Sequence, residues 1–181
     1  MPSEVTGVMS GIIQAERMQF SVSDMVVHPI HGAGRISDIS VKNISGECTE
    51  CVVVDLMVGN AGVLLPVESL DDTGLRHIVD EGTLDTALDM LGGNPEELPG
   101  DWRRRIESLR ERVHSGDPRL VATAVRDIVA RSGHSKVNPS EKRVLSEAVG
   151  VLAGEVALVK RLDVDSARKL VERQAGVRPV R

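Results

Sequence analysis

The sequence predicts an α+β protein in which a small antiparallel β-barrel is followed by a compact all-α unit of about five helices. Between residues 18 and 67, short β-branched runs alternate with Gly- and Pro-rich turns and leave no room for crossover helices. From about residue 82, apolar residues recur with the helical period. The charge divides as well: residues 1–100 carry 4 Lys or Arg against 16 Asp or Glu, and residues 101–181 carry 18 against 11. This split suggests two halves with different partners, with chance drift of surface charge as the alternative.

The strand-rich half should contain four strands, at residues 24–27, 35–41, 51–58 and 63–67. The turns between them are rich in Pro, Gly and Asn, which favour tight reversals, and lie at residues 28–34, 43–47 and 59–62. The run at residues 51–58 is apolar and β-branched, which is typical of a buried strand. Residues 35–41 alternate only imperfectly between apolar and polar side chains.

Five helices should follow, at about residues 83–91, 99–114, 117–133, 138–159 and 164–175. Asp117 before Pro118 is typical of a helix start, and Asn138 with Glu141 three residues later resembles a capping box. The third helix should bury a stripe made of Leu120, Val121, Ala124, Val125 and Ile128.

These elements divide the chain into three parts. Residues 1–17 show no periodicity and are expected to form a loosely ordered tail. Residues 18–80 should form the barrel domain and residues 82–177 the helical domain, with the boundary between residues 71 and 82.

The composition excludes several classes of protein. No segment approaches the ~18 consecutive apolar residues that span a membrane, and the N-terminus lacks the basic region of a signal peptide. Two cysteines in 181 residues do not make a disulfide scaffold, so we expect a cytoplasmic protein. P-loop, GxSxG and HExxH motifs are absent from the sequence, so we expect neither an enzyme nor a cofactor.

Two short motifs contain residue types that bind zinc. Cys48 and Cys51 form a CxxC, and His28 and His31 form an HxxH, which together would supply four ligands. In an extended strand the two sulfurs would point to opposite faces, so zinc would need a turn there. We therefore expect no metal site.

Motifs in both halves occur in an order and spacing that resembles one protein family. They are DMVVHPIHGAG at residues 24–34, LPV at 65–67, WRRR at 102–105, SGD at 115–117, VRD at 125–127 and SEKRVL at 140–145. Together they resemble the CarD/CdnL family of bacterial transcription regulators, over residues 18–172. That family shares its N-terminal module with the RNA polymerase-interacting domain of transcription-repair coupling factors.

The resemblance implies a Tudor-like, or SH3-like, barrel that binds the RNA polymerase β subunit, and a helical domain that contacts promoter DNA at the upstream edge of the melted bubble. Trp102 falls on the position of a minor-groove wedge that stabilises the open complex. The basic residues that match DNA contacts of the family are Arg104, Arg105, Lys142 and Arg143. We expect a monomer with low sequence specificity, associated with the nucleoid through the polymerase.

Taken without the resemblance, Trp102 would belong to the core. It shares a helical stripe with Ile106 and Leu109, which favours burial. The resemblance favours the opposite interpretation, a Trp that faces DNA.

Three residues depart from the pattern of the family. The resemblance implies polymerase contacts by Lys42, Leu64 and Pro66, yet Leu64 stands where the family often has an Arg. Lys42 replaces another Arg, which keeps the charge but loses the two-pronged guanidinium. Glu107 falls where a basic, DNA-facing residue is expected. These departures leave open an alternative, a polymerase- or protein-binding adaptor of the same fold that has lost useful DNA binding.

Overall fold

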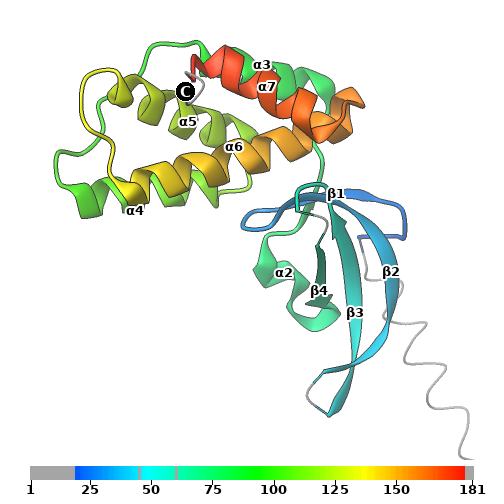
Figure 1. The fold of residues 1–181 in the computed structure, drawn as a ribbon. Helices are drawn as coiled ribbons and strands as arrows, with labels where there is room; N and C mark the ends of the chain where they lie inside the picture. Colours follow the sequence, from blue (N-terminus) through cyan, green and yellow to red (C-terminus); the bar gives the residue numbers. More distant parts are fainter. Residues whose placement is uncertain (1–18, 45, 60, 178–181) are drawn as a thin grey trace, which may run out of the picture.

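The computed structural model describes residues 19–44, 46–59 and 61–177, which form a β-sheet unit and a helical unit (Figure 1). The tail predicted at residues 1–17 lies outside the described residues. The sheet is antiparallel and the helical unit follows it in the chain, which confirms the predicted α+β class. Within the described part of the chain, no helix is both long enough and apolar enough to cross a membrane.

Five strands form one antiparallel sheet in the order β4-β3-β2-β1-β5. Their bounds are β1 Met25–His28, β2 Gly32–Ile44, β3 Glu47–Leu56, β4 Gly62–Pro66 and β5 Arg76–His77. The first four strands overlap those expected from the sequence, but β2 is longer than the expected 35–41, β3 is displaced from the expected 51–58, and β5 was not expected. A register shift between Ile36 and Asp38 marks a β-bulge, which explains the imperfect alternation there because the extra residue changes which face the next side chains occupy.

The sheet is open rather than closed into the predicted barrel. Strands β4 and β5 lie at opposite edges of the sheet. Between them the chain folds into a short 3-10 helix, η1 (Val67–Ser69), and the helix α2 (Leu70–Thr73). Leu70 and Leu75 from this segment are buried in the same apolar cluster as Val26 and Ile36 of the sheet. Side-chain packing therefore covers the side that a barrel would close with backbone hydrogen bonds.

Five helices follow β5, and the longest of them, α6, runs through the middle of the unit (Figure 1). Their bounds are α3 Glu81–Leu91, α4 Trp102–Val113, α5 Pro118–Ser132, α6 Pro139–Lys160 and α7 Val164–Ala175. Each begins after an Asp or Asn whose side chain accepts a backbone hydrogen bond from the first turn. Asn138 and Glu141 form the predicted capping box of α6. Leu120 is 41% exposed, so its predicted place in the buried stripe of α5 is wrong.

The two units meet where β1 and β2 pack against α6. Val27 and Ala33 of the sheet are buried in one cluster with Val151 and Leu158 of α6. Gly154 lies at the closest approach, where an added Cβ would come within 3.1 Å of the Ala33 Cβ. Even an alanine at this position would force a shift, so the junction is closely packed.

Candidate functional site

Trp102 is the first residue of α4 and is exposed. Its neighbours on the predicted stripe, Ile106 and Leu109, are 7% and 0% exposed, whereas Trp102 is 49% exposed. The interpretation of Trp102 as a core residue is therefore wrong. Asp101 caps the helix by accepting hydrogen bonds from the backbone N–H groups of residues 103 and 104. The Arg103 guanidinium lies 5.1 Å from the centroid of the Trp102 ring, in a cation–π arrangement.

The exposed side of α4 forms an open groove that combines this indole with charges of both signs. The groove is lined by Trp102, Arg103, Ile106, Glu107, Arg110, Glu111 and His114. Glu107, which departs from the family pattern, is exposed in this groove together with Trp102 and Arg103. The positive potential along α4 is therefore reduced away from its N-terminus.

Arg104 and Arg105, which were expected to act together, have different surroundings. Arg104 is exposed, whereas Arg105 is 4% exposed. The Arg105 Nε donates to Glu141 Oε1 at 2.5 Å, and its Nη1 donates to the backbone oxygens of residues 99 and 100. Arg105 thus links α4 to α6, and we assign it a structural role instead of the expected DNA contact.

Glu141 holds this part of the helical unit together. Besides Arg105 it accepts a hydrogen bond from the Asn138 backbone N–H at 2.7 Å and one from Arg131 Nε at 3.1 Å. Burial alone would raise the pKa of the Glu141 carboxyl, but the hydrogen bonds from the Asn138 backbone, Arg105 and Arg131 outweigh burial and hold that pKa below its usual value. The carboxylate is therefore charged and fully engaged by its neighbours.

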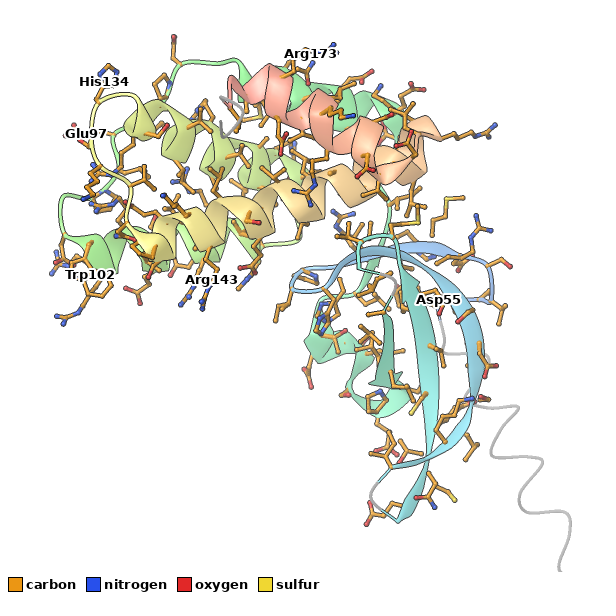
Figure 2. All side chains as sticks on the ribbon, viewed as in Figure 1. Asp55, Glu97, Trp102, His134, Arg143 and Arg173 are labelled. Carbon is orange, nitrogen blue, oxygen red and sulfur yellow. The ribbon has the colours of Figure 1, made fainter. Side chains whose placement is uncertain are left out.

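Lys142 and Arg143 lie near the start of α6 and are both exposed, but they line different hollows. Lys142 borders a largely apolar hollow between α5, α6 and α7. Arg143 borders a hollow at the junction with the sheet unit. Figure 2 shows Arg143 on the same lower side of the helical unit as Trp102. Arg143 and Trp102 thus lie on the same side of the helical unit, although they line different hollows.

The residues expected to contact polymerase share one face of the sheet. Leu64 and Pro66 are two residues apart on β4 and so point to the same side. Pro66 pairs with Cys51 on β3, and Thr49, two residues away on that strand, pairs with Lys42 on β2. Cross-strand partners point to the same side, so Lys42 belongs to this face as well.

This face is accessible at its edge. Leu64 is 46% exposed, and β4 is an edge strand. Lys42 Nζ lies 2.9 Å from Asp38 Oδ2 in a partly exposed ion pair. Such pairs contribute little to stability, so Lys42 can exchange Asp38 for an acidic partner at low cost.

The possible zinc ligands do not form a site in the described residues. Cys48 is exposed and Cys51 is buried, and no group of three or more His, Cys, Asp or Glu side chains that could hold a metal occurs within residues 19–44, 46–59 and 61–177. His28 instead shapes the turn after β1, because its Nδ1 accepts hydrogen bonds from the backbone N–H groups of Ile30 and His31. Burial, with a smaller effect of His31, lowers the pKa of His28 to about 4.

Comparison with known proteins matches each of the two units to a known domain family. The CarD-like/TRCF RID domain matches residues 20–79, and the CarD C-terminal domain matches residues 86–172. The first range contains the sheet and the second most of the helical unit. The chain is also similar to the "Putative transcription factor YdeB" of Bacillus subtilis (strain 168), with 25% identity over 141 residues that cover 78% of this chain and 92% of that protein.

Both family models belong to CarD proteins, and they match consecutive parts of the chain in the order of the two units. The family is one of transcription factors and not of enzymes. The chain therefore belongs to the CarD family of transcription regulators, which interact with RNA polymerase.

Proposed function

We propose that this protein binds the β subunit of RNA polymerase through its sheet unit and stabilises the promoter open complex by contacting DNA at the upstream edge of the melted bubble. The observation that carries this proposal is the exposed indole of Trp102 at the start of α4. An exposed indole is free to pack against an unstacked base step. Apolar wedges of this kind recur among proteins that bind the minor groove.

The charges around Trp102 suit the phosphates on either side of such a wedge. Arg103, Arg104 and Arg143 are exposed, and the N-terminus of α4 presents the positive end of the helix dipole. Phosphate contacts position a protein without reading bases, so we expect binding that depends strongly on salt and weakly on sequence. A single copy of the chain carries Trp102 and all the arginines proposed to contact DNA, so we propose that the protein acts as a monomer.

The sheet unit offers a surface of a different kind. The edge strand β4 has one side without a strand partner within the sheet, and Leu64 adds an exposed apolar side chain next to it. A protein partner gains main-chain hydrogen bonds at such an edge, and side-chain contacts add specificity. Polymerase binding through Lys42, Leu64 and Pro66 is consistent with the acidic charge of this half, which disfavours DNA.

The alternative function is an adaptor that binds polymerase or another protein but has lost useful DNA binding. Glu107 and Glu111 favour it, because both line the same groove as Trp102. A carboxylate next to a phosphate is repelled, and each one offsets part of the attraction of a neighbouring arginine.

Binding to fork-junction DNA separates the two functions. We expect the affinity of the full chain for labelled fork-junction DNA to fall linearly on a log–log plot against salt, with a slope set by the number of phosphate contacts. Glu107→Gln should strengthen binding, and DNA should change the Trp102 emission, since the chain has a single Trp. A chain that binds polymerase but shows no salt-dependent DNA binding would be the adaptor.

A further inference from the structure

A hollow of about 380 Å³ lies at the junction of the two units. The turn between β1 and β2 contributes Ile30 and His31, α6 contributes Arg143 and Gly150, and α7 contributes Arg168. His31 and Arg143 belong to separate sequence motifs and Arg168 to none, so the sequence does not show that the three residues meet.

The arginines of this hollow differ from those of the helical unit that pair with a carboxylate. Arg105 and Arg131 both contact the Glu141 carboxylate. Within the described residues, by contrast, no carboxylate oxygen lies within 4 Å of Arg143 or Arg168. The hollow therefore contains two guanidinium groups whose charge is not compensated by an ion pair.

Glu147 and Gly150, which also line the hollow, leave the two guanidinium groups accessible. Glu147 Oε1 lies 2.6 Å from His114 Nε2, a contact that holds the carboxylate toward α4. At Gly150 an added Cβ would lie 3.7 Å from Arg168 Nη2, so the guanidinium rests directly over this glycine. A planar guanidinium with free N–H groups binds two oxygens of a phosphate at once.

The hollow continues the surface that carries Trp102. In Figure 2, Trp102 and Arg143 lie along the lower side of the helical unit, and the turn between β1 and β2 lies beyond Arg143. We propose that this hollow is a subsite for a phosphodiester of the DNA backbone, held by Arg143 and Arg168 with His31 as a further donor. The inference rests on the proposed DNA contact and extends it from the helical unit to the junction. DNA bound there also touches the sheet unit, which couples DNA binding to the packing of the two units.

The test compares two arginines of the same helix in the full-length protein. Arg168→Gln removes a guanidinium from the hollow, and Arg173→Gln removes the same charge from α7 at a position that Figure 2 shows on the upper side of the molecule. Loss of one phosphate contact should reduce the slope of log affinity against log salt by about 0.7–0.9. We expect that reduction, with a several-fold loss of affinity for fork-junction DNA, in Arg168→Gln but not in Arg173→Gln.

Two outcomes would overturn this inference, and neither is confused with failure of the proposed function. Equal slopes for the two variants, with wild-type binding intact, would remove the subsite and leave the DNA contact at Trp102 standing. Absence of salt-dependent binding by the wild-type chain would remove the proposed DNA contact itself.

A nuclear magnetic resonance titration distinguishes backbone phosphate from a free anion. Amide signals of Gly150 and Val151, which line the hollow, should shift at stoichiometric fork-junction DNA and remain unmoved by inorganic phosphate at equal concentration. Saturation by inorganic phosphate without a response to DNA would make the hollow a site for a free anion, contrary to the proposal.

Discussion

Arg76 of β5 and Glu155 of α6 form a two-pronged ion pair across the junction of the sheet and helical units. Arg76 Nη1 lies 2.7 Å from Glu155 Oε1, and Nη2 lies 2.9 Å from Oε2. Glu155 is 1% exposed and also accepts a hydrogen bond from the Val79 backbone N–H at 3.0 Å. Glu155 thereby holds the segment that leaves the sheet, residues 76–79, against α6.

Glu155→Gln should therefore destabilise the protein strongly. The change leaves Arg76 without a counter-charge at a mostly buried site. Removing one partner of a buried ion pair costs about 3–5 kcal/mol of unfolding free energy. We expect a value near the lower end, because Arg76 is partly exposed. Glu81→Gln is the matched control, because Glu81 contacts Lys160 at the surface and should change the free energy of unfolding by less than about 1 kcal/mol. Urea denaturation followed by circular dichroism measures both, and similar losses in the two variants would contradict the role of the Arg76–Glu155 pair.

Substitution of Arg105 should lower the stability of the protein, whereas substitution of Arg104 should weaken DNA binding. Arg105→Ala leaves the buried Glu141 with only Arg131 as a charged partner and should cost about 3 kcal/mol of unfolding free energy. Arg104→Ala should change stability by less than about 0.5 kcal/mol, because Arg104 is an exposed residue, and should weaken binding to fork-junction DNA. If Arg105→Ala folds as stably as wild type and loses only DNA affinity, the structural role assigned to Arg105 is wrong.

Much of the helical unit follows from local signals, which explains why its prediction succeeds. Helix starts such as Asn138 are set by side-chain hydrogen bonds within a few residues, and their sequence signatures are short. The burial of Arg105 and the exposure of Trp102 depend instead on where α6 lies relative to α4. The helical period alone places Trp102 on the apolar stripe, and the stripe does not show that the buried part of this stripe begins one turn later, at Ile106.

The sheet shows the same limit. Its strands and turns follow from β-branched runs and turn residues, but whether the sheet closes depends on the segment between β4 and β5. That segment folds into η1 and α2 and packs Leu70 and Leu75 against the sheet. The arrangement is non-local, so periodicity within single strands does not indicate it. The hollow lined by Arg168 could not be predicted from the sequence for the same reason, because residues from distant parts of the chain form it.

Stability should fall on mild acidification because of His28. Its pKa in the folded protein is about 4, lowered from 6.5 chiefly by burial. The unfolded chain therefore binds this proton more readily, so the stabilisation is complete above about pH 6.5 and is lost as the pH falls toward 4. His28→Asn keeps an oxygen that can accept from the backbone N–H groups of the turn but does not titrate. The stability difference between wild type and His28→Asn should change across this pH range; parallel curves would contradict the assignment.

Leu64 should limit the affinity for polymerase. Leu64→Arg adds a guanidinium at the position where the resemblance led us to expect one, and it should strengthen capture of core RNA polymerase by the full chain. Val41→Arg is the control, since Val41 is 63% exposed on β2 and lies beside Lys42, on the opposite side of the sheet. An equal increase in both variants would reflect added charge alone, and no increase in Leu64→Arg would show that Leu64 does not limit the contact.

The lifetime of the promoter open complex, measured with Trp102→Ala, tests the central proposal most directly. Leu162→Ala serves as control, because Leu162 is another exposed apolar residue of the helical unit, 37% exposed. We predict that Trp102→Ala shortens the lifetime about tenfold, equivalent to ~1.4 kcal/mol, with polymerase affinity unchanged and a stability loss below about 1 kcal/mol. An unchanged lifetime, or a stability loss of about 3–5 kcal/mol typical of a core Trp, would contradict the wedge.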